Sequence, residues 1–217
     1  MTLPKYIQGV IFDLDGTLLD SLEVWHDVDT RFFAKRGMPL PEGYAKAILS
    51  MSLPEAAIYT KTEYNLPDSP EALVEEWLLM VKEEFANRVE MKPYAKELLM
   101  QLFQSGIKLG VATSSAKELF LPCLKRHGVA HLFTAFTETR EAPRGKNFPD
   151  PYLLAAERLH LKPQNCAVFE DILVGVRSAK LGGFYTVAIS DFHSRTDEPA
   201  LRAEADLFIT SFQELLS

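Results

Sequence analysis

The sequence predicts an α/β protein: an open parallel sheet with helices on both faces, interrupted after its first strand by an all-helical insertion. Two observations support this prediction. From Pro93 onward, helical segments alternate with short β-branched and aromatic runs, the pattern of repeated βα units. Between residues 22 and 91, apolar residues recur at helical spacing without a strand signal. Ligands bind outside the carboxyl ends of such strands, so the insertion is positioned to act as a lid.

The first strand is predicted at residues 10–12, an apolar Val-Ile-Phe run of the kind that is buried on both faces. Asp13 and Asp15 follow it directly, and Gly16 then permits a tight turn. Residues i and i+2 of an extended chain face the same side, so both carboxylates can face one point. Taken alone, Asp15-Gly16 is more typical of an acidic turn than of a metal site. Two facing carboxylates repel each other, however, and Mg²⁺ between them would remove the repulsion.

Four helices are predicted in the insertion. The first follows Ser21 or Asp20 as the N-cap and ends at Gly37. The others cover residues 44–49, 54–64 and 71–88, and the last of these is introduced by Ser69 and Pro70, an N-cap followed by an N1 proline.

The second half of the chain supplies the remaining βα units. Pro122 is expected to kink or split the helix in which it lies. Asp150 is expected to cap the helix that follows it, with Pro151 at N1. The predicted strands are residues 107–112, 133–138, 166–169, 184–189 and a last short one within 205–210, and the predicted helices end at or near Gly106, Gly128, His160 and Gly183.

Polar side chains stand where three later strands or loops reach the same edge of the sheet. Thr113 and Ser114 follow one strand, where hydroxyl and backbone N–H groups form an anion cradle or merely cap the next helix. Lys146 lies in a loop before a helix, where an isolated lysine is usually solvated. Glu170 and Asp171 follow another apolar strand, and burying them unpaired would be costly, which again indicates a metal ion.

These stretches, in this order, resemble the four signatures of the haloacid dehalogenase superfamily. The string DLDGTLLDS resembles the first signature, Thr113 the second, the block GKNFPDPY the third, and the Glu170-Asp171 pair with Gly175 the fourth. Ile172 departs from the pattern, because a serine is usual there. The resemblance implies a Rossmann-like catalytic core from residues 1–20 and 92–217, with a helical cap from residues 21–91.

The resemblance also implies a Mg²⁺-dependent phosphohydrolase. Asp13 would be the nucleophile and Asp15 the general acid/base, a residue that the dehalogenase branch lacks. Thr113, Ser114 and Lys146 would bind the substrate phosphate. The metal ligands would be Asp13, the backbone carbonyl of Asp15, and Asp171, with Glu170 as an outer or alternative ligand.

The same residues argue against the alternatives to a phosphatase. A β-phosphoglucomutase-like enzyme carries a histidine where this chain has Trp25, with His26 one position late, and an arginine that residues 49–52 lack. Trp25 is therefore interpreted as core, His26 as solvated, and Lys46 and Lys61 as surface lysines. A receiver-like phospho-acceptor module would have no helical insertion, and an inactive binding protein would not need all of the acidic residues and Lys146.

Composition limits the partners. The net charge is -7, from 23 basic and 30 acidic residues without a basic stripe, which argues against nucleic acid. No apolar run approaches the roughly 20 residues of a membrane span. The two cysteines, Cys123 and Cys166, are isolated and indicate a reducing compartment. We expect a cytoplasmic protein that acts on a small phosphorylated metabolite as a monomer, with a dimer as the alternative.

Overall fold

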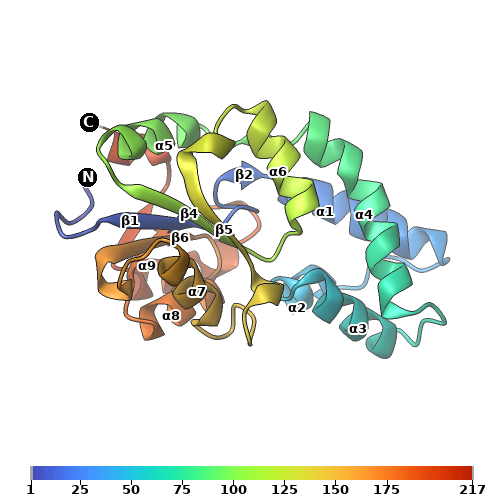
Figure 1. Ribbon diagram of the computed structural model, residues 1–217. Helices are drawn as coiled ribbons and strands as arrows, with labels where there is room; N and C mark the ends of the chain where they lie inside the picture. Colours follow the sequence, from blue (N-terminus) through green and yellow to red (C-terminus); the bar gives the residue numbers. More distant parts are fainter. Residues whose placement is uncertain (1, 217) are drawn as a thin grey trace.

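The computed structural model describes residues 2–216 and contains a six-stranded, wholly parallel sheet (Figure 1). The strand order β5-β4-β1-β6-β7-β8 and the flanking helices confirm the predicted α/β class. The strands are β1 (Gly9–Phe12), β4 (Lys108–Thr113), β5 (Phe133–Glu138), β6 (Cys166–Glu170), β7 (Tyr185–Ile189) and β8 (Leu207–Ile209).

The first strand, β1, lies in the middle of the sheet. Phe12 is in register with Val111 of β4 on one side and with Phe169 of β6 on the other. Because both edges of β1 are paired and both faces are covered, its apolar residues are fully buried. The chain order reverses on either side of β1, so its carboxyl end lies at the switch point where ligands bind in such sheets.

Helices cover both faces of the sheet. Val10 and Phe12 share one hydrophobic cluster with α5 (Ala95–Gln104), α6 (Lys117–Arg126) and the 3₁₀ turn η5 (Phe212–Leu215). Ile11, on the opposite face, packs with α7 (Asp150–Arg158) and α8 (Leu173–Leu181), next to α9 (Glu198–Glu204). Shorter 3₁₀ turns are η1 (Ala130–Leu132), η2 (Thr139–Glu141), η3 (Pro163–Asn165) and η4 (Arg195–Asp197).

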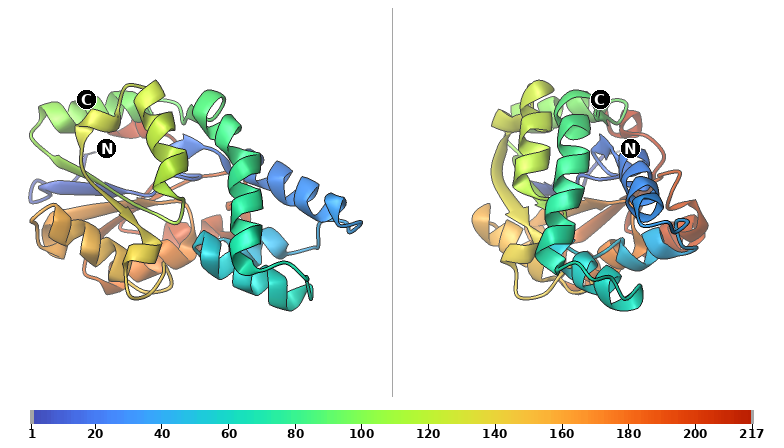
Figure 2. Two further views of the ribbon diagram at one scale, coloured as in Figure 1. Left: turned by 45° about the vertical axis from the view of Figure 1, so that its right-hand side comes forward. Right: turned by 90° about the vertical axis from the view of Figure 1, so that its right-hand side faces the viewer.

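The insertion forms four helices beyond the carboxyl ends of the strands (Figures 1 and 2). They are α1 (Leu22–Lys35), α2 (Tyr44–Ile48), α3 (Leu53–Glu63) and α4 (Pro70–Asn87). Aromatic side chains fill the space between them. The ring centroids of Phe32 and Trp77 lie 5.3 Å apart, and those of Phe33 and Tyr44 lie 4.8 Å apart. As the sequence predicts, Ser69 accepts a hydrogen bond from the backbone N–H of Ala72 at the start of α4.

Two short strands join the insertion to the sheet. β2 (Leu19–Asp20) pairs antiparallel with β3 (Glu90–Met91), so the chain enters and leaves the insertion side by side. Lys92, just beyond, donates to Asp191 at 2.6 Å in a largely buried ion pair. Strands of two residues are too short to show alternation, which is why the sequence did not predict them. The paired crossing supports the proposed division into a core of residues 1–20 and 92–217 and a cap of residues 21–91.

Two local expectations need correction. Of the two effects expected of Pro122, a kink or a split, the split does not occur, because α6 is continuous around it and buries Leu119, Phe120 and Cys123 against the core. Packing therefore outweighs the loss of one backbone hydrogen bond. Asp150 does not cap α7 but is its first residue, and its carboxylate accepts both hydrogen bonds of the Arg144 guanidinium at 3.0 and 2.9 Å.

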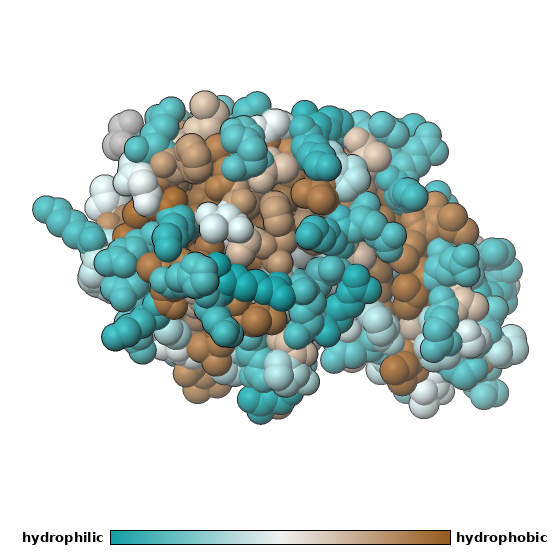
Figure 3. Space-filling model, in the orientation of Figure 1, coloured by the Kyte–Doolittle hydropathy of each residue, from teal (hydrophilic) through white to brown (hydrophobic). Residues whose placement is uncertain are grey.

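The surface in Figure 3 carries hydrophilic side chains over much of one face, with apolar areas between them. Among the described helices, none combines the length and apolar character that crossing a bilayer requires.

We predict that Phe32→Ala lowers the free energy of unfolding by about 3–5 kcal/mol, because it removes a fully buried ring and leaves a cavity. Urea unfolding followed by circular dichroism measures the change. Ile58→Ala is the control, since Ile58 is 57% exposed on α3 and its loss should change stability by no more than about 0.5 kcal/mol. Equal effects of the two substitutions would contradict the assignment of Phe32 to the core.

Candidate active site

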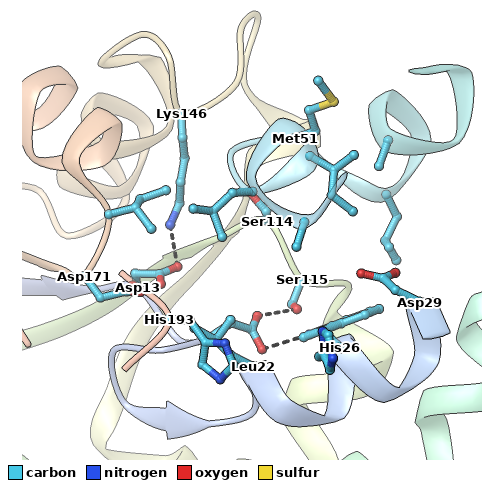
Figure 4. A pocket seen from close by; sticks show the side chains of 18 residues that line it. Asp13, Leu22, His26, Asp29, Met51, Ser114, Ser115, Lys146, Asp171 and His193 are labelled. Carbon is cyan, nitrogen blue, oxygen red and sulfur yellow. Dashed lines mark hydrogen bonds and ion pairs between the residues drawn. The ribbon is translucent and has the colours of Figure 1, made fainter. Parts of the chain in front are cut away.

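A cavity of about 180 Å³ lies between the carboxyl ends of the strands and helices α1 to α3. Asp13 enters it from the end of β1, Asp171 from the end of β6, and Lys146 from the loop before α7 (Figure 4). Residues of α1, α2 and α3 form the opposite wall. Residues far apart in the sequence therefore meet at the switch point of the sheet, as the prediction required.

Lys146 connects the acidic side chains of two strands. Its ammonium donates to Asp13 Oδ1 and, at 2.5 Å, to Glu170 Oε1, which also accepts from the Tyr152 hydroxyl at 2.6 Å. Lys146 is 2% exposed, so it is not the solvated loop lysine of the simpler interpretation. Buried charges persist only when they are paired and hydrogen-bonded in this way.

Burial and mutual charge interactions shift the pKa values of the charged residues in the site. Burial raises the pKa of Asp13 to about 7, although the positive charge of Lys146 opposes that shift. Burial alone would lower the pKa of Lys146, but the charges of Asp13 and Glu170 outweigh it and hold the pKa above its ordinary value. Burial also raises the pKa of Asp171 well above its ordinary value, and the nearby charges of Asp13 and Glu170 add to that shift. One lysine therefore does not neutralise the cluster.

Asp13, Glu170 and Asp171 form an acidic cluster that fits a metal ion. One carboxylate oxygen from each lies within 4.8 Å of the others, and all three residues are buried. Glu170 Oε2 and Asp171 Oδ2 have no hydrogen-bond partner within residues 2–216, whereas Asp171 Oδ1 accepts from Thr17 at 2.9 Å. Buried, unpartnered carboxylate oxygens are the hard ligands that Mg²⁺ prefers, and a dication would offset the charge that Lys146 leaves.

Asp15 is held apart from this cluster by three donors. Its Oδ1 accepts from Ser21 Oγ at 2.5 Å and from the indole Nε1 of Trp25 at 3.2 Å, and its Oδ2 accepts from Ser115 Oγ at 2.5 Å. The side chain of Asp15 is thus not one of the clustered carboxylates, and the prediction named only its backbone carbonyl as a ligand.

The sequence does not predict these partners of Asp15. Trp25 packs against the core and Ser21 is the N-cap residue of α1, as expected, but Trp25 also lines the cavity and the Ser21 hydroxyl bonds to Asp15 instead of capping the helix. The missed signal is their spacing, since Ser21 and Trp25 are four residues apart at the start of a helix and share one face. Ser115 carries no comparable signal, because only the fold brings it to Asp15.

The other predicted phosphate-binding residues lie at the turn from β4 to α6. Ser114 lines the cavity. Thr113 is fully buried below it, and its hydroxyl accepts from the Ser115 backbone N–H at 3.1 Å, which shapes the turn. The helix that follows begins at Lys117, so Ser114 and Ser115 belong to the loop.

Two glycines make room for the acidic side chains. Gly16 has a φ of +77°, and a Cβ there would lie 2.4 Å from Asp171 Oδ2. A Cβ at Gly175 would lie 2.6 Å from Glu170 Cδ. Both positions therefore exclude any larger residue while the carboxylates keep their places. Ile172, which stands where the superfamily has a serine, is buried and adds an apolar surface to the cavity.

Comparison with known proteins agrees with the fold and the site. A family model described as "Haloacid dehalogenase-like hydrolase" matches residues 10–189. "Phosphorylated carbohydrates phosphatase" of Thermotoga maritima is 28% identical over 211 residues, which cover 97% of each chain. "Hexitol phosphatase A" of Escherichia coli K12 is 29% identical over 96% of this chain and 93% of its own. The crystal structure of CbbY from Rhodobacter sphaeroides in complex with phosphate has a TM-score of 0.85 at 23% identity, covers 96% of each chain, and supports the fold.

The chain belongs to the haloacid dehalogenase-like hydrolase family, because the family model covers most of its length. The assignment made from the four sequence signatures is therefore confirmed, and so is the prediction of a phosphoric monoester hydrolase at the level of its class.

We predict that Lys146→Met destabilises the fold by about 3–5 kcal/mol, because it leaves the carboxylates of Asp13 and Glu170 buried without their cation. Chemical denaturation at pH 8 measures the loss. Lys125→Met is the matched control, since Lys125 is exposed on α6 and has no ion pair within the described residues. If the two variants were equally stable, the ion pairs of Lys146 would not hold this site together.

Proposed function

We propose that the protein is a Mg²⁺-dependent phosphatase of small phosphate monoesters that works through an aspartyl-phosphate on Asp13. The observation that supports this most strongly is the separation of two aspartates by environment. Asp13 lies in the buried cluster with Lys146, Glu170 and Asp171, whereas Asp15 is held beside it by hydroxyl and indole donors. This difference in environment supports the proposal that Asp13 attacks phosphorus and that Asp15 transfers the proton.

The proposed reaction has two steps. A carboxylate oxygen of Asp13 attacks phosphorus, and the ester oxygen leaves with a proton from Asp15. Water then attacks the phosphorus of the aspartyl-phosphate, and Asp15 accepts a proton of that water. The bond between phosphorus and the Asp13 oxygen breaks, which frees the Asp13 carboxylate and inorganic phosphate. Lys146 and the turn at Thr113 and Ser114 would hold the phosphoryl oxygens. Mg²⁺, held by Asp13, Asp171, the Asp15 backbone carbonyl and, as an outer or alternative ligand, Glu170, would neutralise the negative charge of phosphate and nucleophile.

The partners of Asp15 indicate which of its oxygens carries the proton. An indole N–H is only a donor, so the Oδ1 that accepts from Trp25 stays an acceptor in either protonation state. The transferable proton is therefore carried on Oδ2, beside Ser115. A serine hydroxyl can accept from a protonated carboxyl as readily as it donates to a carboxylate.

A phosphomutase is the less favoured alternative. Such an enzyme holds a second phosphate away from the reacting one, which requires cationic side chains. Among the described residues that line the cavity, Lys146 is the one lysine or arginine, and it is already paired with two carboxylates. Lys46 instead lies 3.9 Å from Asp197, and Lys61 donates to backbone carbonyls. His26 is exposed at the cavity wall.

The names of two relatives support a sugar-like substrate class. The matching proteins of Thermotoga maritima and Escherichia coli are named for phosphorylated carbohydrates and for hexitols. We therefore propose a phosphorylated sugar or a similar metabolite as the substrate. The helical insertion argues against a receiver-like phospho-acceptor module, which would not need a lid over its acidic pocket.

Phosphate release from p-nitrophenyl phosphate and a panel of sugar phosphates tests the proposal. We expect release with Mg²⁺, none with EDTA, and a fall of about 10³-fold or more in Asp13→Asn, which loses the nucleophile while keeping nearly the same shape. Circular dichroism should show an unchanged fold. Turnover by Asp13→Asn at the native rate would exclude the aspartyl-phosphate.

We predict that Ser115→Ala impairs esters with poor leaving groups most. Without the Ser115 hydroxyl, Asp15 loses the partner of the oxygen that carries its proton. The value of kcat/KM should fall about tenfold for alkyl phosphates but much less for p-nitrophenyl phosphate, whose leaving group needs little protonation. Ser105→Ala is the control, because Ser105 is exposed at the end of α5. An equal fall in kcat/KM for alkyl phosphates and for p-nitrophenyl phosphate would show that Ser115 has no role in the proton transfer.

A further inference from the structure

Asp29 is a buried acid in the cap wall of the cavity that the proposed mechanism does not use. It lies on α1, four residues after Trp25, and is 6% exposed. Figure 4 shows its carboxylate at the side of the cavity away from Asp13 and Lys146. Burial raises the pKa of Asp29 to about 7. Within residues 2–216, no side chain or backbone group donates a hydrogen bond to it and no cation pairs with it.

One neighbouring donor, the Tyr44 hydroxyl, is already engaged. Burial raises the pKa of Tyr44, and the charge of the nearby Asp29 adds to that shift. The Thr60 hydroxyl donates its proton to the Ala56 carbonyl at 2.7 Å, so the Tyr44 hydroxyl is the donor in its 2.8 Å bond with Thr60. The proton of Tyr44 is thus not available to Asp29. The carboxyl keeps its hydrogen-bonding capacity for the cavity.

The cap wall of the cavity is largely apolar. Ala45 and Ile48 of α2 and Leu53 and Ala56 of α3 line the cavity together with Asp29, and His26 of α1 is a polar member of the same wall. An acid without a partner in such surroundings destabilises the fold, so its presence is explained most simply by a ligand that supplies the missing donor. Binding sites commonly contain residues that lower the stability of the fold and are retained because they contact a ligand.

We propose that Asp29 selects phosphate esters whose leaving group carries a hydroxyl group at the end remote from the phosphate, and that it disfavours esters with an anionic group there. This inference rests on the proposed phosphatase function and names the substrate class within it. The surrounding apolar side chains would contact the C–H groups of a sugar or an alditol, while the hydroxyl group remote from the phosphate donates to Asp29.

Charge and protonation both favour this class. A remote carboxylate or second phosphate would meet Asp29 in a buried place where repulsion is strong. Among the described residues, no lysine or arginine other than the paired Lys146 lines the cavity to offset that repulsion. A carboxyl group that titrates near neutral pH can both donate to and accept from a hydroxyl, whereas an ammonium group offers donors only. A hydroxyl therefore satisfies Asp29 in either protonation state.

Three six-carbon esters test the selection: sorbitol 6-phosphate, 6-phosphogluconate, which carries a carboxylate at the far end, and hexyl phosphate, which carries no hydroxyl. The wild-type protein should prefer sorbitol 6-phosphate in kcat/KM by about tenfold or more over each of the others. In Asp29→Leu the ratio of kcat/KM for sorbitol 6-phosphate to that for hexyl phosphate should fall about tenfold. In Asp29→Asn the ratio of kcat/KM for sorbitol 6-phosphate to that for 6-phosphogluconate should also fall. Asp27→Leu and Asp27→Asn are matched controls, because Asp27 is exposed on the same helix and does not line the cavity.

A binding measurement keeps this test independent of turnover. In the Asp13→Asn background with Mg²⁺, titration calorimetry should show about tenfold weaker binding of sorbitol 6-phosphate when Asp29→Leu is added. Unchanged affinity, or wild-type substrate ratios in the Asp29 variants, would overturn the role of Asp29 and leave the phosphatase proposal standing. If the wild-type protein bound sorbitol 6-phosphate through Asp29 but hydrolysed no ester, the phosphatase proposal alone would fail.

Thermal unfolding at pH 8 separates a ligand-binding role from a structural one. Asp29→Leu should raise the Tm, because it replaces an unpartnered buried carboxylate with an apolar side chain of similar size. A lower Tm in Asp29→Leu would show that Asp29 stabilises the cap, and that result would overturn the inference.

Discussion

The ion pairs that Lys146 makes with Asp13 and Glu170 are the interaction on which the rest of the site depends. Three charged groups lie buried together, and each is kept there by the others. Lys146 comes from a loop, whereas Asp13 and Glu170 stand at the ends of neighbouring strands, so these bonds join the loop to the sheet. The excess of carboxylate oxygens over cations in this cluster is also the physical reason why it fits a metal ion.

The cap contributes to chemistry as well as to enclosure. Trp25 belongs to the first cap helix but donates to Asp15, so the orientation of the proposed general acid depends on the position of that helix. Asp29, one turn further along the helix, faces the opposite part of the cavity. Under these proposals, helix α1 would orient the proton donor through Trp25 and contact the leaving group through Asp29. Recognition of the leaving group would then be coupled to the step in which that group departs.

Much of the fold could be predicted because it depends on local patterns. The strand at residues 10–12 and the Ser69-Pro70 helix start carry their signals in a few adjacent residues, and the structure has both. Predictions failed where a local rule competed with tertiary contacts. Pro122 stays inside a continuous helix because that helix packs on the core, and Asp150 pairs with Arg144 although an aspartate before a proline is a typical cap.

The sequence by itself determined the order of the elements, the helical insertion and the residue types at the ends of the strands, because hydrophobic periodicity and the four signatures are local properties of the chain. Only the tertiary structure decided what those residues contact. Ser115 meets Asp15 across 100 positions, and Lys146 reaches Asp13 across 133. Such contacts depend on how the strands are ordered in the sheet. The environment of Asp29 likewise depends on the fold, because the Tyr44 hydroxyl near it donates to Thr60 instead.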